Sequence, residues 1–262
     1  MLVRALARLV VVGLWGGLVF CAQGVQAQQT PSRNWATVPR HSSGQAPDPR
    51  QHMDQAIVQV YAAPTYGWRG NFAVHPWIIY KREGQTAYTR YDVVGWRAPR
   101  VVQRNYAIPD GLWYGSLPEL LVDHRGAGVE TMIDRIEAAV ASYPYADQYR
   151  SYPGPNSNTF LAHIGREVRA LQLDLPSNAI GKDYRPLSNP VGVSPSGSGV
   201  HVSLLGLLGV SVGLQEGLEL NVLGLNFGID LNAPALRLPF VGRVGMRDTP
   251  APNESARTDA GG

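Results

Sequence analysis

The hydrophobic positions in the middle of the chain predict three strands. The segments AIVQVYAA (56–63), FAVHPWIIYK (72–81) and TAYTRYDVVGW (86–96) are rich in β-branched and aromatic residues, which suit the pleated surface of a sheet. The residues REGQ between the last two segments predict a hairpin turn. Three such segments in close succession predict an antiparallel sheet.

Two later segments have the three- and four-residue spacing of apolar side chains that is typical of amphipathic helices. The first runs over 129–143 and ends before Pro144. The second runs over about 158–171, and Ser157 or Asn158 is placed to accept a backbone N–H as its cap. Together with the strands, these helices predict an α+β fold.

The predicted α+β domain covers residues 53–187, and the character of the sequence changes after it. Within residues 200–231, Leu205-Gly206-Leu207 recurs as Leu223-Gly224-Leu225. Each glycine in a helix would cost about 1 kcal/mol, so this density of glycine favours short strands and tight turns. We therefore predict a Gly-rich β-appendage over residues 188–246 that packs on the main domain.

The first 27 residues have the pattern of a secretory signal peptide. Arg4 and Arg8 precede twelve apolar or glycine residues, and Val25-Gln26-Ala27 follows as a small-residue cleavage pattern. A retained membrane anchor is the alternative, but the apolar run is shorter than the roughly 20 residues that span a bilayer. We expect cleavage near Ala27, a disordered tether over 28–52 and a disordered tail over 247–262. The protein is then exported, to the periplasm or cell envelope.

Cysteine content and charge exclude several classes of function. The single cysteine, Cys21, lies within the signal segment, so the mature chain has no disulfide and no cysteine nucleophile. The bulky Phe20 before it argues against a lipoprotein. Loss of Arg4 and Arg8 lowers the formal net charge from +3 to +1, which gives no support to a nucleic-acid partner. No two histidines have metal-ligand spacing, and we expect neither a metal nor another cofactor.

His75 and Asp92 predict two members of a catalytic triad. If the hairpin turns about Glu83 and Gly84, His75 lies opposite Asp92 on the neighbouring strand. A carboxylate beside an imidazole fixes its tautomer and raises its basicity. Ser157 is predicted at the start of a helix, where unsatisfied N–H groups stabilise a developing negative charge. These residue types in this order point to nucleophilic catalysis.

This order resembles that of the circularly permuted papain-like proteins, which include relatives of the NlpC-type cell-wall peptidases and the lecithin:retinol acyltransferase group. The histidine lies in AVHPWIIY, and about eighty residues later PNSNTF matches the nucleophile motif with Ser157 in place of cysteine. The resemblance implies that Ser157 attacks, His75 exchanges the proton and Asp92 orients His75. Asn156 and Asn158 would flank the oxyanion site.

The chain resembles one family more closely. The segments YGWRG, YPYADQYR, GPNSNTF and AIGKDY are similar to a family of uncharacterised bacterial envelope proteins, domain of unknown function family 3750. The similarity runs from about residue 56 to 186 and over much of the C-terminal β-segment. It implies an envelope location and carries no established activity.

Three functions stay open at this point. The first is an amide or ester hydrolase or acyltransferase acting on a cell-envelope peptide, glycan or acyl substrate, with Trp77 and Tyr91 lining the cleft. The second is a non-catalytic binding module that has lost its cysteine, in which Ser157 is only a helix cap and His75 only a core residue. The third is an interaction protein that contacts a membrane surface or another envelope protein through residues 200–231.

Overall fold

The computed structural model describes residues 35–246, and Val38 to Met246 belong to one compact unit. The predicted signal peptide, the first residues of the predicted tether and the predicted tail therefore lie outside the described residues. No helix between residues 35 and 246 combines the length and hydrophobicity that crossing a membrane requires. Over the described residues the fold is α+β, with two antiparallel sheets and two α-helices, as the hydrophobic pattern predicts.

The first sheet has five strands in the order β4-β3-β2-β1-β5. Their bounds are β1 Ile57–Pro64, β2 Val74–Lys81, β3 Thr89–Val93, β4 Val102–Arg104 and β5 Glu119–Arg125. The first three strands confirm the three predicted segments. The pattern did not predict β4 and β5. Short 3-10 helices cover Gly67–Asn71 and Gly95–Arg97 between the strands.

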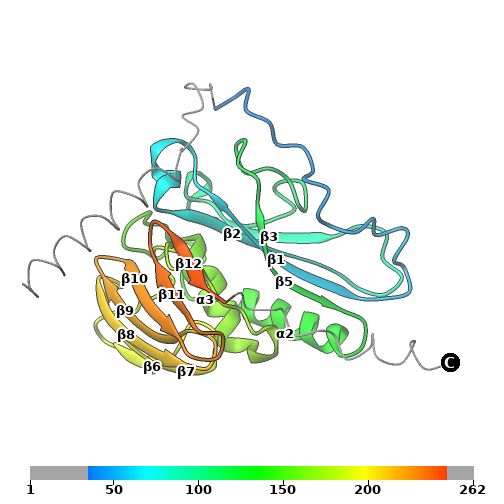
Figure 1. Ribbon diagram of the computed structural model, residues 1–262. Helices are drawn as coiled ribbons and strands as arrows, with labels where there is room; N and C mark the ends of the chain where they lie inside the picture. The colour runs from blue at the N-terminus through cyan, green and yellow to red at the C-terminus, as the bar shows by residue number, and fades with distance from the viewer. Residues whose placement is uncertain (1–34, 247–262) are drawn as a thin grey trace, which may run out of the picture. The chain divides into compact units, whose positions relative to one another are not determined.

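Two helices pack on one face of this sheet (Figure 1). Helix α2 covers Val129–Ala141, and helix α3 covers Ser157–Glu167 and is followed by a 3-10 turn at Arg169–Leu171. Alternate residues of β1 and β2, such as Val60 and Ile78, join helix residues such as Ile133 and Phe160 in one buried cluster. Burial of this apolar surface is the main term that stabilises the domain.

The other face of the sheet carries a second apolar cluster, formed by Tyr61, Trp77 and Trp113 with their neighbours. Residues 38–46, which belong to the segment expected to be a tether, lie on this side (Figure 1). Ser42, Ser43 and Gln45 all hydrogen-bond to one carboxylate oxygen of Asp110. Contacts between polar groups hold this segment in place. Because the residues that make these contacts are polar, the segment has the composition of a disordered tether although it is ordered.

The β2–β3 hairpin differs from the predicted register by two residues. Ile79 pairs with Arg90, and Ile78 pairs with Tyr91, so by the same register His75 does not lie directly opposite Asp92. Because side chains alternate between faces with a period of two, a displacement of two residues keeps His75 and Asp92 on one face. The two side chains still meet, as diagonal neighbours.

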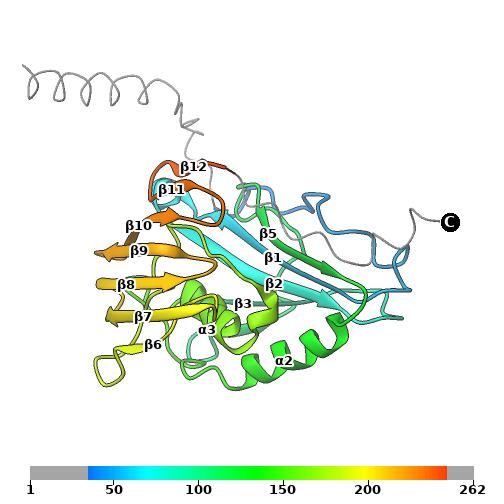
Figure 2. The ribbon, with the colours of Figure 1, turned by 60° about the horizontal axis from the view of Figure 1, so that its bottom comes forward.

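The second sheet has seven strands in the order β12-β11-β10-β9-β8-β7-β6, each antiparallel to its neighbours (Figure 2). Their bounds are β6 Val191–Val193, β7 Gly199–Leu204, β8 Leu208–Gly213, β9 Gly217–Val222, β10 Leu225–Asp230, β11 Ala235–Leu238 and β12 Gly242–Gly245. The Gly-rich segment is therefore a meander of short strands, as its glycine content predicts. The internal repeat marks two hairpin turns in it, because Leu205, Gly206, Leu223 and Gly224 all have positive φ.

Buried polar contacts attach the second sheet to the residues that follow α3. Lys182 Nζ lies 2.7 Å from Glu219 Oε2 of β9, and Arg237 of β11 pairs with the other oxygen of Glu219 at 3.0 Å. Asn221 and Asn226 both donate to Asp183 Oδ2, at 2.8 and 2.7 Å. Charged groups are tolerated in such a position because each has a partner.

Candidate functional site

His75 and Asp92 form the centre of a buried cluster on the face of the first sheet that lies away from the helices. His75 Nε2 is 3.7 Å from Asp92 Oδ2, which is beyond hydrogen-bond length. Arg90 donates to the same oxygen from Nη2 at 2.7 Å and from Nε at 3.1 Å. The His75 ring stacks on Trp113 with 3.6 Å between ring centroids. The predicted His–Asp pair is present, with an arginine as a third member.

The electrostatics of this cluster favour a neutral imidazole. Burial lowers the pKa of His75, although Asp92 beside it acts in the opposite direction. Burial acts to raise the pKa of Asp92, but His75 and Arg90 outweigh it and hold that pKa below its usual value. Near neutral pH the carboxylate is therefore ionised and paired with Arg90. The imidazole is uncharged and enclosed, which suits a packing role.

Asn156, not Ser157, caps helix α3. Its side-chain oxygen accepts from the backbone N–H groups of Asn158 and Thr159, and Thr159 Oγ1 accepts from the Asn156 backbone N–H, which completes a capping box. The Asn156 side chain also donates to the carbonyl of Ile180 at 2.9 Å. The Asn158 side chain donates to the carbonyls of Ile180 at 2.8 Å and Val74 at 3.2 Å. Both asparagines fix the helix start to its surroundings.

Ser157 is the first residue of α3 and is buried, with 4% of its surface exposed. Its helix packs on the sheet face that carries Val74 and Ile78. His75 projects from the opposite face, where it stacks on Trp113. Within residues 35–246 no hydrogen bond joins Ser157 to His75. The structure therefore brings His75 and Asp92 together and leaves Ser157 outside that pair.

Trp77 and Tyr91, predicted to line one cleft, lie on opposite faces of the sheet. Trp77 is fully buried in the cluster with Tyr61, and its indole N–H donates to the carbonyl of Pro109 at 2.8 Å. Tyr91 stacks on Tyr80 on the helix side. Tyr91 pairs with Ile78, the residue after Trp77, and successive strand residues point to opposite faces of the sheet. Trp77 and Tyr91 therefore do not line one cleft, and that prediction is wrong.

Two polar residues outside the predicted triad, His124 and Lys182, also have defined partners. His124 lies in β5, and its Nε2 is 3.0 Å from the carbonyl of Leu171. Lys182 belongs to the AIGKDY segment and forms the buried pair with Glu219. No group of three His, Cys, Asp or Glu side chains gathers as metal ligands between residues 35 and 246. A lysine and an aspartate beside each other offered no signal for a buried network.

The second sheet exposes a face with three rows of paired residues, whose side chains are all aliphatic except Phe227; we call it the apolar face. Each row crosses neighbouring strands in register. The first row has one residue from each of the seven strands: Val193, Val200, Val212, Leu218, Ile229, Leu236 and Val244. The second row is Val191, Val202, Val210, Leu220 and Phe227, and the third is Leu204, Leu208, Val222 and Leu225. All of these side chains except the half-buried Leu225 are exposed.

The opposite face of the second sheet is polar and buried. His201, Ser211 and Glu219 form one row across β7, β8 and β9. A sheet that covers the apolar core of a soluble domain has the reverse arrangement. An exposed apolar surface of this extent marks a site of interaction, so the apolar face is the strongest candidate for a functional surface in the described chain.

Comparison with known proteins bears on the first part of the chain. No curated protein and no solved structure matches this chain. Residues 55–184 match the family described as Protein of unknown function (DUF3750). The matched range ends before β6, so the second sheet lies outside it. The papain-like resemblance receives no support from these comparisons. The match supports the closer resemblance over residues 55–184, but it does not extend to the C-terminal β-segment that the resemblance was expected to include.

Proposed function

We propose that this protein is a non-catalytic cell-envelope protein that works by assembly through the apolar face. The partner that we propose is the apolar face of a second copy of the chain, packed sheet against sheet. In this proposal the pattern of residues 1–27 directs export, and cleavage near Ala27 releases the protein. The observation that carries the proposal is the continuous, uncharged and exposed surface of strands β6–β12.

The size of the apolar face suits a stable contact between two copies. Strands about 4.8 Å apart and about 20 Å long give a seven-stranded face of roughly 600 Å², allowing for the shorter outer strands. Two such faces bury about 1,200 Å² together, which is the lower end of the range for specific interfaces. Flat aliphatic sheets pack face to face about 10 Å apart. A two-fold contact needs only one self-complementary surface.

A membrane surface fits the apolar face less well than a second copy does. Segments that lie in the membrane interface carry lysine or arginine on the polar side and tryptophan or tyrosine at the boundary. The three rows of the apolar face contain only valine, leucine, isoleucine and one phenylalanine. The sheet is also open, with β6 and β12 at its edges. Open sheet edges are costly in hydrocarbon because their backbone groups lack partners.

The geometry argues against the hydrolase that the residue order suggested. That reaction requires the Ser157 hydroxyl within about 2.6–3.2 Å of a base. Here His75 projects from the sheet face away from α3, and its pKa is lowered by burial. The capping contacts of Asn156 and the carbonyl contacts of Asn158 explain the polar residues around Ser157. The motif therefore fits a structural role in a binding or assembly protein.

Sedimentation velocity of the purified protein tests the proposal. The wild type should form a dimer whose dissociation depends on concentration. Leu220→Lys, in the central row, should raise the dissociation constant about 100-fold or more, because it buries an ammonium group in an aliphatic interface. The matched control is Leu187→Lys, which replaces an exposed leucine outside the strands. It should leave the dimer intact.

Two results would contradict the proposal. One is a wild-type protein that stays monomeric up to its solubility limit. The other is a dimer that persists in Leu220→Lys while circular dichroism shows native structure. A third result would change the partner. If the protein is a monomer that binds vesicles of phosphatidylethanolamine and phosphatidylglycerol, and Leu220→Lys abolishes this binding, then lipid and not a second copy contacts the apolar face.

A further inference from the structure

A surface pocket of about 430 Å³ opens beside β4. It is lined by Trp96, Arg97, Ala98, Arg100, Val102, Gln103 and Arg104. These residues come from the 3-10 helix Gly95–Arg97, the turn after it and the edge strand β4. A single short stretch of chain therefore lines a surface pocket with three arginines.

The three arginines give this pocket a strong local positive charge. The stretch from Val93 to Pro109 contains Arg97, Arg100 and Arg104 and no acidic residue. Within residues 35–246 none of the three is paired with a carboxylate, and all are exposed. The remainder of the chain is close to electrically balanced, with a formal net charge of +3 overall. The positive charge of the pocket is therefore a local feature.

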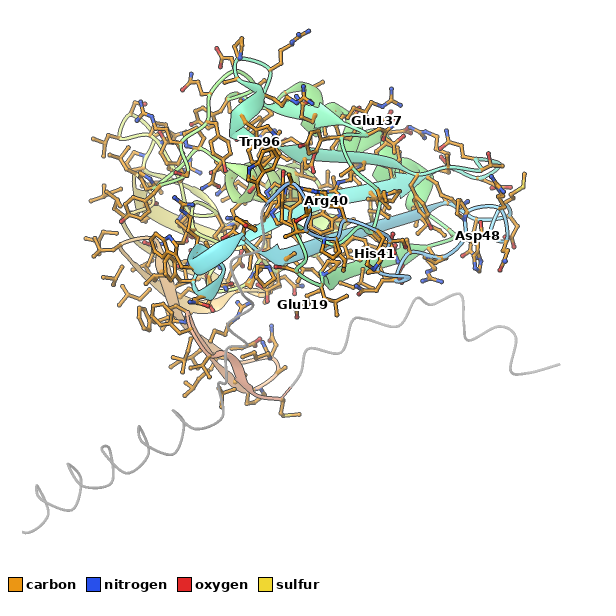
Figure 3. The ribbon with its side chains drawn as sticks, turned by 90° about the horizontal axis from the view of Figure 1, so that it is seen from above. Arg40, His41, Asp48, Trp96, Glu119 and Glu137 are labelled. Atoms are coloured by element: carbon orange, nitrogen blue, oxygen red, sulfur yellow. The ribbon has the colours of Figure 1, made fainter. Side chains whose placement is uncertain are left out.

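Trp96 forms an apolar wall of the same pocket. Trp96 is 58% exposed, but contacts with two other aromatic residues hold its ring in place. Its ring stacks on Trp113 with 6.2 Å between centroids and 25° between planes, and its indole N–H donates to the hydroxyl of Tyr106 at 3.2 Å. Figure 3 labels Trp96, which lies on the side of the first sheet away from the helices. A large indole held in place at the surface provides a flat binding platform.

We propose that this pocket binds a small ligand in which a phosphate or carboxylate is attached to a ring. The guanidinium groups of Arg100 and Arg104 bind the oxyanion, for which their planar fork is suited. Trp96 stacks on the ring, and Arg97, whose guanidinium lies 5.5 Å from the Tyr106 ring centroid, closes the pocket on one side. A sugar phosphate, a sugar acid and a nucleotide all carry this chemistry. The site uses none of the residues of the apolar face, so it stands independently of the proposed assembly.

Isothermal titration calorimetry with defined probes tests this site. The probes are N-acetylglucosamine 1-phosphate, glucuronate and adenosine monophosphate, with inorganic phosphate and neutral N-acetylglucosamine as partial ligands. We expect at least one ring-bearing anion to bind more tightly than either partial ligand, and its affinity to fall with added salt. The preferred probe identifies whether a sugar phosphate, a sugar acid or a nucleotide is the natural class.

Three variants separate the roles of the pocket residues. The double variant Arg100→Gln and Arg104→Gln should weaken binding of every anion about tenfold or more, because charge-assisted hydrogen bonds are lost. Trp96→Ala should remove the advantage of the ring-bearing anion over inorganic phosphate. Arg135→Gln, an exposed arginine on α2, is the matched control and should bind as the wild type does. Binding of none of the three anions to the wild type, or binding that survives the double arginine variant, would overturn the assignment.

Discussion

The first sheet buries apolar side chains on both of its faces, whereas the second sheet buries polar side chains and exposes aliphatic ones. In the first sheet, Val60 and Ile78 contact the helices, and Tyr61 and Trp77 contact the loops on the other side. In the second, Leu218 and Leu220 of β9 are exposed, and Glu219 between them is buried. Strands β7–β10 alternate exposed apolar residues with buried polar or glycine residues, whereas β1 is apolar at every position except Gln59. The second sheet is unusual because its polar face is the buried one.

This difference shows that a buried ionic network can determine which face of an amphipathic sheet is covered. Lys182 and Asp183 lie at the base of the second sheet, where Glu219, Asn221 and Asn226 supply their partners. Turning the sheet over would leave these charges buried against aliphatic side chains, at a cost of several kcal/mol for each unpaired ion. The apolar face is thereby held outward and kept available for a partner.

Two leucines that differ mainly in burial provide the largest test of this comparison. Leu161 in α3 is fully buried, and Leu220 in β9 is 46% exposed on the apolar face. Leu161→Ala should lower the free energy of unfolding by about 3 kcal/mol or more, because it leaves a cavity. Leu220→Ala should lower it by less than about 1 kcal/mol when the protein is dilute enough to be monomeric.

Urea unfolding of both variants, followed by circular dichroism at low protein concentration, measures these differences. Equal losses in the two variants would show that the apolar face is already buried within one chain. At a concentration where two copies associate, the loss in Leu220→Ala should increase, because association stabilises the folded state by mass action.

The elements whose signal is local could be predicted from the sequence. The periodicity over 129–143 identified α2, and the glycine-rich turns identified the strands of the second sheet as a β-region. Strand β5 was missed because its charged residues Asp123 and Arg125 pair with each other on the surface of a strand that otherwise resembles a loop. The ordered residues 38–46 were missed because Asp110, far along the chain, holds them.

The candidate triad could be predicted only in part. Neighbouring strands of a hairpin bring His75 and Asp92 together, and this was visible in the residue order. Which face of the sheet the pair occupies depends on where α3 packs, and no local pattern states that. The polar face of the second sheet depends in the same way on Lys182, which is distant in sequence from Glu219. Long-range packing decided both features.

The two buried histidines of residues 35–246, His75 in β2 and His201 in β7, give the next test. Burial lowers the pKa of His201 to about 4, with Asp183 acting against this and Arg166, Arg185 and Lys182 acting with it. The unfolded chain therefore takes up the proton first as the pH falls. The contribution of His201 to the free energy of unfolding should be constant above pH 6.5. It should fall by about 3 kcal/mol between pH 6.5 and 4.

Thermal or urea unfolding across this pH range, with His201→Gln beside the wild type, tests that expectation. The variant should have a flatter profile below pH 6.5. The pKa of His75 is also lowered, so His75 contributes a loss of the same sign in both proteins. A variant whose profile is as steep as that of the wild type would assign the acid sensitivity to the first sheet and not to the network beneath the second.

Asn156 and Ser157 give the smallest and most specific test, at the junction where α3 meets the first sheet. Asn156→Ala removes the helix cap and the bond to Ile180, so it should lower the free energy of unfolding by about 2 kcal/mol. Ser157→Ala should change it by no more than about 0.5 kcal/mol. An activated fluorophosphonate should fail to label Ser157, because the neutral His75 projects from the far side of the sheet. Labelling that disappears in Ser157→Ala would instead require a base that reaches the start of α3, and would restore a catalytic role to a position that the structure uses as the first turn of a helix.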